Sequence, residues 1–148
     1  MQHGEALPSG QDPARPLSET GRGDVERLAA LLAERGVALS RVVHSGKLRA
    51  RQTAEILASR LSPSVEPEVH DGLAPKDRAG DFASGLSAWG SDSLIVGHLP
   101  FLDRCLSWLV SGHEGGGIAA FRPGAMVCLA PDESGGWTIV WMLQPDLF

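Results

Sequence analysis

The chain has 148 residues, the size of one ordinary domain with one hydrophobic core. Its 18 acidic and 13 basic residues give a formal net charge of -5, and no long run of either sign is present, which argues against nucleic acid as a partner. With only Cys105 and Cys128 and no apolar run of about 18 residues, we expect a reduced cytoplasmic protein with no disulfide framework, no Cys-based zinc site and no membrane contact.

The N-terminal half predicts a loop, a helix, a strand and a second helix. Residues 5–17 are rich in Pro, Gly and polar residues without apolar periodicity, so we expect a loop there. Ser18 is a predicted helix cap, and apolar residues recur at helical spacing over residues 19–35. The short β-branched segment 41–44 predicts a strand, and residues 47–61 predict a helix.

The next segments continue this alternation. Residues 65–70 favour a strand at the edge of a sheet, because Pro67 cannot donate a hydrogen bond to a neighbouring strand. Residues 76–90 indicate a helix, although two glycines interrupt it. The apolar run 94–97 predicts a strand covered on both faces, and Pro100 is a residue that opens helices.

The C-terminal region predicts an antiparallel hairpin, since the apolar runs 125–130 and 137–143 flank the turn-forming sequence PDESGG. Strands that alternate with helices favour a mostly parallel sheet between helical layers. We therefore expect residues 1–148 to form a single-domain three-layer α/β/α sandwich with a mostly parallel sheet and a C-terminal antiparallel hairpin.

Polar residues follow three of the predicted strands. His3 would end a first strand, Ser45 and Gly46 follow the strand 41–44, and His98 follows the strand 94–97. Because ligands bind where the loops at the carboxyl ends of the strands converge, neighbouring strands would bring two histidines to one rim.

The segment SGKLRARQTAEIL adds a cation to this rim. Ser45 is expected to cap the following helix, whose exposed first-turn N–H groups favour an anion. Arg49 lies about one turn into that helix and shares a face with Gln52 and Thr53. Arg49 could instead pair with Glu55 on a solvated helix face, but together these features predict a phosphate pocket.

Five segments match, in order, the motifs of a known family. They are QHGEA at 2–6, RPLSETG at 15–21, HSGKLRARQTAEIL at 44–57, VGHLPFL at 96–102 and FRPGAMVCL at 121–129. On these residues the chain resembles the histidine phosphatase superfamily, and within it the SixA type of small phosphohistidine phosphatases. The resemblance implies a phosphoglycerate mutase-like fold.

The resemblance also implies the roles of the site residues. His3 would be the nucleophile that attacks phosphorus, while Arg49 and His98 would bind the phosphoryl oxygens, with no metal and no cofactor. Arg15 would either reach the same pocket or only fix its loop. A neutral imidazole can attack without a separate base, and Gly4 would leave room for the substrate to approach His3.

Two departures from the family pattern stand out. Gln2 takes the place of the usual arginine as a phosphate-binding residue, and Met1 leaves almost no residues for the strand that His3 should end. This first strand is apparently truncated, so we expect the natural start to lie a few codons upstream; an intact mass of the native protein equal to this sequence would contradict that. No residue is a firm general acid, and Glu5 and Asp71 are only weak candidates.

Three functions fit these observations. The first is hydrolysis of phosphohistidine in a signalling or phosphorelay protein, a substrate that suits a short chain with an open rim and no general acid. The second is hydrolysis of a small phosphorylated metabolite with a phosphoester bond. The third is a phosphate-binding module with weakened or lost catalysis, suggested by Gln2 and the short first strand.

Replacing Gln2 by arginine tests the cost of this departure. A unit charge at about 4 Å is worth about 4 kcal/mol before desolvation at a surface-like dielectric constant, so Gln2→Arg should bind phosphate more tightly and turn over faster. The measurement is the phosphatase rate of the two proteins, and an unchanged or lower rate in the variant counts against the prediction.

Overall fold

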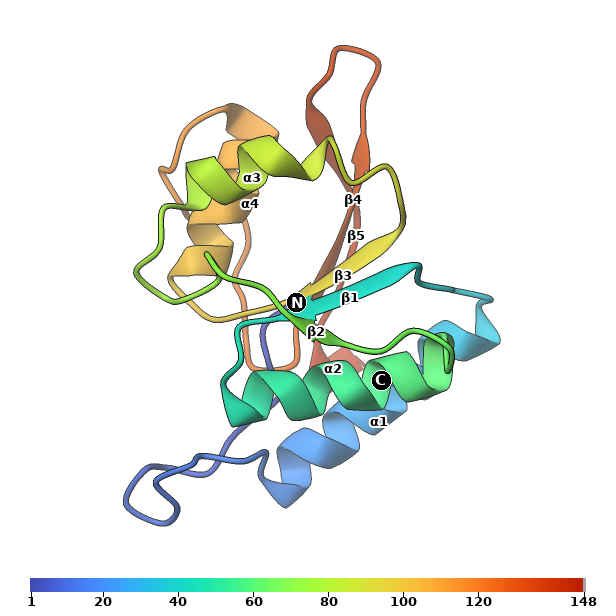
Figure 1. The fold of residues 1–148 in the computed structure, drawn as a ribbon, viewed down its shortest axis with the longest axis vertical. Helices are drawn as coiled ribbons and strands as arrows, with labels where there is room; N and C mark the ends of the chain where they lie inside the picture. Colours follow the sequence, from blue (N-terminus) through green and yellow to red (C-terminus); the bar gives the residue numbers. More distant parts are fainter. Residues whose placement is uncertain (148) are drawn as a thin grey trace.

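The computed structural model describes residues 1–147 and has helices on both faces of a parallel sheet (Figure 1). Helices α1 and α2 pack together on one face, and α3 and α4 pack together on the other. In chain order the elements are α1 (Glu19–Glu34), β1 (Arg41–His44), α2 (Leu48–Leu61), β2 (Glu68–Val69), α3 (Ala79–Leu86), β3 (Ser93–Val96), α4 (Phe101–Ser111), β4 (Met126–Pro131), β5 (Trp137–Leu143) and the 3-10 helix η1 (Pro145–Leu147).

The parallel sheet has the strand order β2-β1-β3, and β4 and β5 form a separate antiparallel hairpin. The first residues of the chain connect the two. The Gly97 N–H donates to the Met1 carbonyl at 3.1 Å, and the His3 N–H donates to the Gly97 carbonyl at 3.2 Å. On the other side the Gln2 N–H donates to the Ala125 carbonyl at 2.9 Å. Residues 1–3 therefore lie beside the end of β3, joined to it by an isolated parallel bridge between Gln2 and Gly97, and His3 is the last residue of this segment.

Strand β1 shows why the sheet is covered on both faces. Val42 belongs to the core formed with α1 and α2, whereas the next residue, Val43, belongs to the core formed with α3 and α4. Both valines are fully buried. Successive side chains of a strand point to opposite faces, so a continuous apolar run indicates helices on each side.

The structure confirms the predicted α/β fold with its parallel strands and C-terminal hairpin. Ser18 caps α1 as expected, because its hydroxyl accepts from the Gly21 N–H at 3.0 Å. The helix predicted over 76–90 is shorter, because Asp77 accepts from the Ala74 N–H and holds the preceding residues in a turn. The predicted strand 65–70 is reduced to Glu68–Val69 at the sheet edge.

Two glycines allow α1 to approach the segment that carries His3. A Cβ on Gly4 would lie 2.9 Å from the Gly21 carbonyl oxygen and 2.9 Å from a Val25 methyl group. A Cβ on Gly21 would lie 2.1 Å from the Glu5 carbonyl oxygen. Gly4 is thus required for helix packing, which differs from the role beside the substrate expected from the sequence.

A pair of alanine variants in α1 tests this close approach. Gly21→Ala should lower the free energy of unfolding by about 1 to 3 kcal/mol, because the new methyl group meets the Glu5 backbone. Gly23→Ala is the matched control, since its Cβ has only the Arg27 guanidinium, at 3.5 Å, nearby, and it should raise stability by up to about 1 kcal/mol. Urea denaturation measures both; shifts of the same sign would refute the packing described.

Candidate active site

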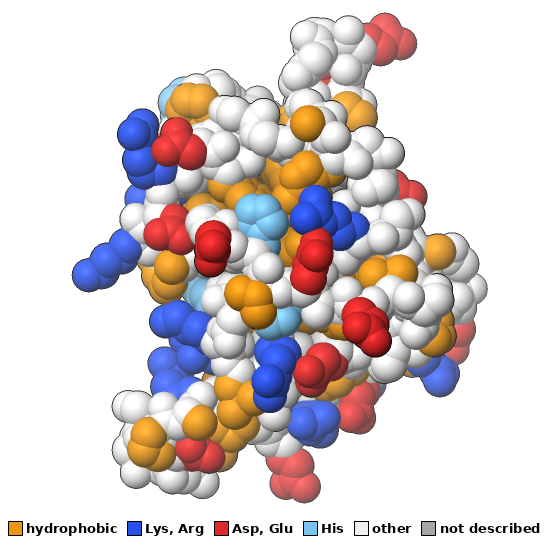
Figure 2. All heavy atoms as spheres, in the orientation of Figure 1, with side chains coloured by type: hydrophobic (Ala, Val, Ile, Leu, Met, Phe, Trp, Pro, Cys, Tyr) orange, Lys and Arg blue, Asp and Glu red, His pale blue; other side chains and the backbone are white. Residues whose placement is uncertain are grey.

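The structure brings His3, Arg49 and His98 together from three separate elements. His3 is the last residue of the N-terminal segment 1–3, Arg49 lies in the first turn of α2, and His98 lies two residues after β3. The two imidazole ring centres are 4.9 Å apart, and the Arg49 Nε donates to the His3 Nε2 at 3.1 Å. In Figure 2, Lys and Arg side chains lie on the side of the molecule where Figure 1 places the start of α2, with Asp and Glu side chains above them on the same side.

Hydrogen bonds at both ring nitrogens define the tautomer of His3. The Nδ1 lies 2.7 Å from the Gly4 carbonyl oxygen, which can only accept, so Nδ1 carries the proton. The Nε2 accepts from Arg49 and therefore presents a lone pair. This lone pair is the group that a nucleophilic histidine needs.

Helix α2 also holds the residues around His3. The Thr53 hydroxyl accepts from the Gly4 N–H at 3.0 Å and donates to the Arg49 carbonyl at 2.8 Å. The Gln52 side chain accepts from the Leu17 N–H at 2.8 Å. The predicted helix face is therefore real, and the same three- and four-residue spacing was the signal for the supporting roles of Gln52 and Thr53.

Ser45 does not cap α2, so that prediction was wrong. The helix begins at Leu48 after Lys47, which makes no side-chain capping bond, and Gly46 adopts a left-handed turn with φ 82°. This turn separates Ser45 from the helix, and the Ser45 hydroxyl lies 2.5 Å from the His98 Nε2. The other His98 ring nitrogen is buried and has no hydrogen-bond partner within residues 1–147.

Gln2 and Arg15 lie near the three central residues but make different contacts. The Gln2 side chain is buried, and its Oε1 has no partner in the described part of the chain. Arg15 has a positive φ of 50°, and its Nε donates to the Leu7 carbonyl at 3.1 Å, so it helps to fix the loop. Its positive charge is also close enough to lower the pKa of His3 and the pKa of Arg49.

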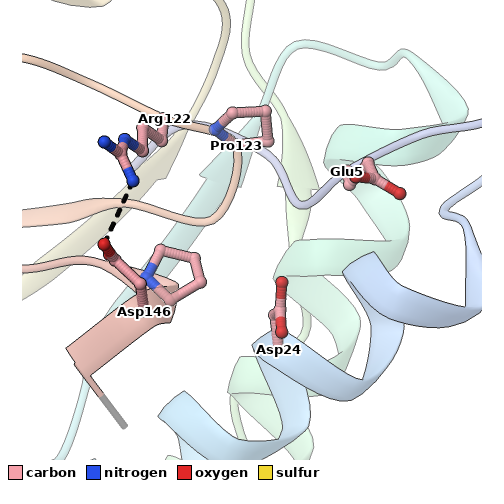
Figure 3. Close-up of a pocket in the computed structure, with 6 residues that line it drawn as sticks. Glu5, Asp24, Arg122, Pro123 and Asp146 are labelled. Atoms are coloured by element: carbon pink, nitrogen blue, oxygen red, sulfur yellow. Dashed lines mark hydrogen bonds and ion pairs between the residues drawn. The ribbon is translucent and has the colours of Figure 1, made fainter.

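The carboxylates considered as general acids make other contacts. The Glu5 carboxylate accepts from the Ser18 hydroxyl at 2.6 Å and lines a cavity of about 190 Å³ with Asp24 and Arg122 (Figure 3). Asp71 lines a different cavity of about 370 Å³. Neither carboxylate is hydrogen-bonded or ion-paired to His3 or His98 within residues 1–147. The alternative pairing of Arg49 with Glu55 is wrong, because Glu55 pairs with Arg51 at 3.5 Å.

The groups that meet at the site are two imidazoles, one guanidinium and one hydroxyl, a set that suits an oxyanion. Nowhere in residues 1–147 do three His, Cys, Asp or Glu side chains gather closely enough to hold a metal ion. Within the same residues, every helix is too short or too polar to cross a membrane.

Burial keeps both imidazoles neutral at physiological pH. It is the main reason that the pKa of His3 falls to about 4 and that of His98 to about 3. The hydrogen bond to Gly4 raises the pKa of His3, but burial and the nearby cations outweigh it. Lys47, which sequence reasoning missed, is one of these cations.

The comparisons with known proteins identify the family. The sequence profile described as "Histidine phosphatase superfamily (branch 1)" matches residues 3–83, more than half of the chain. The phosphohistidine phosphatase SixA of Escherichia coli is 30% identical over 150 residues, covering 98% of this chain and 91% of the relative. The chain therefore belongs to the histidine phosphatase superfamily. It is a phosphatase with a histidine nucleophile.

Solved structures support the same assignment. The protein histidine phosphatase SixA complexed with tungstate matches with a TM-score of 0.85 and 32% identity, over 99% of this chain and 96% of that one. The alpha-ribazole phosphatase of Shigella flexneri matches with a TM-score of 0.77 over 98% and 95% of the two chains, but its 16% identity shows only the shared fold. The expected phosphoglycerate mutase-like fold is confirmed.

The neutral imidazoles predict a particular titration. Their folded pKa values lie below the unfolded value of about 6.5, so the unfolded chain binds more protons as the pH falls, and the free energy of unfolding should decrease between about pH 6.5 and about pH 4. By NMR, His3 and His98 should remain neutral from about pH 8 to about pH 5. The urea-denatured chain is the control, and a folded-state midpoint near 6.5 for His3 would contradict the effect of burial.

Proposed function

We propose that this protein is a phosphohistidine phosphatase that hydrolyses the phosphorylated histidine of a signalling or phosphorelay protein through a covalent intermediate on His3. One observation carries the proposal: the His3 Nε2 presents a lone pair beside the Arg49 guanidinium and the His98 ring. The roughly 30% identity to SixA over nearly the whole chain supports the phosphohistidine substrate.

In the first step, Arg49 exchanges its hydrogen bond to the His3 Nε2 for one to a phosphoryl oxygen, and the freed Nε2 lone pair attacks phosphorus. The bond between phosphorus and the substrate imidazole breaks, and its electron pair stays on the imidazole nitrogen. Arg49 donates to the phosphoryl oxygens, which spread negative charge in the transition state, and His98 donates through Nε2 in exchange for its contact with the Ser45 hydroxyl. The His3 ring becomes a phosphorylated imidazolium. Its Nδ1–H bond to the Gly4 carbonyl stabilises this positive charge.

In the second step, water attacks phosphorus, and the Nε2 recovers its electron pair. The proton from water leaves with the phosphate, while Nδ1 keeps its own proton, so His3 returns to the starting tautomer. The departing substrate imidazole is a good leaving group when its other nitrogen is protonated. A general acid is then dispensable, and neither the Glu5 nor the Asp71 carboxylate is hydrogen-bonded to His3 or His98 within residues 1–147.

Secondary assignments complete the proposal. Gln2 contributes to phosphate binding, and Arg15 adds its charge to the same pocket. Residues 1–148 form one histidine phosphatase domain that needs no metal or cofactor and works in the cytoplasm. A small phosphorylated metabolite with a phosphoester bond is the alternative substrate within the same superfamily. Gln2 in place of arginine favours a phosphate-binding module with lost catalysis as the remaining alternative.

Trapping of labelled phosphate tests the nucleophile and the substrate class together. The protein should acquire acid-labile label from a phosphorylated substrate, and His3→Ala should abolish both the label and turnover. The control is His113→Ala, which replaces an exposed histidine after α4 and should leave both unchanged.

The same assay separates the alternatives. Faster hydrolysis of phosphoramidate than of p-nitrophenyl phosphate supports phosphohistidine as the substrate, and the reverse order favours a phosphoester. Phosphate binding without label and without turnover would leave only the binding module.

A further inference from the structure

Two exposed apolar side chains stand at the mouth of the phosphate pocket. Val69 is 64% exposed at the end of β2, and Leu99 is 38% exposed directly after His98. Val69 pairs with His44, the last residue of β1, and Leu99 comes three residues after the end of β3, the strand on the other side of β1. Single exposed apolar residues are common on protein surfaces and need no explanation. These two are distinguished by their connection to the site.

The connection runs through the turn after β1. A Cβ on Gly46 would lie 3.4 Å from a Val69 methyl group, so Val69 stands directly over this turn. The preceding residue, Ser45, contacts the His98 ring. Val69 is therefore connected to His98 through Gly46 and Ser45.

A cation lies at the same mouth. Lys47 is exposed and follows Gly46, and it forms no ion pair within residues 1–147. The chain as a whole is acidic, with a net charge of -5, whereas Arg15, Lys47 and Arg49 are all close enough to lower the pKa of His3. The charge distribution thus favours the approach of an anionic group at this edge.

A free small anion would use the cations and leave the two apolar side chains in water. Their exposure contributes to binding only when a partner surface covers them together with the pocket. We propose that Gly46, Lys47, Val69 and Leu99 form a docking rim for a histidine-phosphorylated protein, whose apolar residues around the phosphohistidine cover Val69 and Leu99. This inference rests on the proposed function, because it names the surface by which that substrate is recognised.

The test compares a large and a small substrate of the same chemistry. Val69→Asn replaces the most exposed apolar residue of the docking rim without adding charge, and Val140→Asn is the matched control, because Val140 is 57% exposed in β5 of the hairpin. For each protein, kcat/KM is measured with phosphoramidate and with a phosphorelay phosphotransfer protein phosphorylated on its histidine. Thermal unfolding checks that both variants are folded.

Val69→Asn should lower kcat/KM for the phosphorylated protein by about tenfold, equivalent to about 1.4 kcal/mol, and leave the value for phosphoramidate unchanged. Val140→Asn should change neither. Equal effects of Val69→Asn on both substrates, or none, would overturn the docking rim while leaving the phosphatase function intact. A wild-type dimer that Val69→Asn dissociates would overturn it by assigning this face to a second copy. If the wild-type protein hydrolyses neither substrate, the proposed function fails first, and the docking rim with it.

Discussion

The arrangement of the site depends on two hydrogen bonds to one imidazole. The Gly4 carbonyl accepts from the His3 Nδ1, and Arg49 donates to the His3 Nε2, so the ring has one tautomer and one orientation. The rest of the fold holds these two partners in place. Thr53 connects Gly4 to the backbone of Arg49, and α1 packs against Gly4 through Gly21. In the proposed mechanism, His3 is thus oriented for attack before any substrate binds.

Burial and the nearby cations both lower the pKa of the His3 ring. An imidazolium at His3 would lose solvent and face Arg49, so the neutral form that can attack phosphorus is favoured well below pH 7. His98 is held neutral by the same causes, with His3 as a further contribution. The formal positive charge at the centre of the site therefore comes from Arg49 rather than from the histidines. If His3 is the nucleophile, as proposed, it stays neutral while the cation beside it attracts the anionic substrate.

Much of the fold and of the site could be predicted from the sequence, because both leave local patterns in it. These are the periodic spacing of apolar residues and the polar residues that directly follow strands. Apolar runs separated by helical periods predicted the parallel strands, and residues that follow strands predicted that His3 and His98 would meet at one rim. Ser45 was misplaced, because the left-handed turn at Gly46 separates it from α2 and no local pattern shows that it contacts His98. The packing role of Gly4 was also missed, since it depends on Gly21 across the fold.

The proposed mechanism requires that the His3 Nε2 is the atom that bonds to phosphorus. Phosphorus NMR of the trapped phosphoenzyme, with histidine isotopically labelled at one ring nitrogen at a time, identifies that atom through its coupling to phosphorus. The structure predicts coupling to the Nε2 of His3, because Nδ1 carries a proton that it donates to the Gly4 carbonyl. Coupling to Nδ1, or a phosphoryl group on His98, would contradict this account.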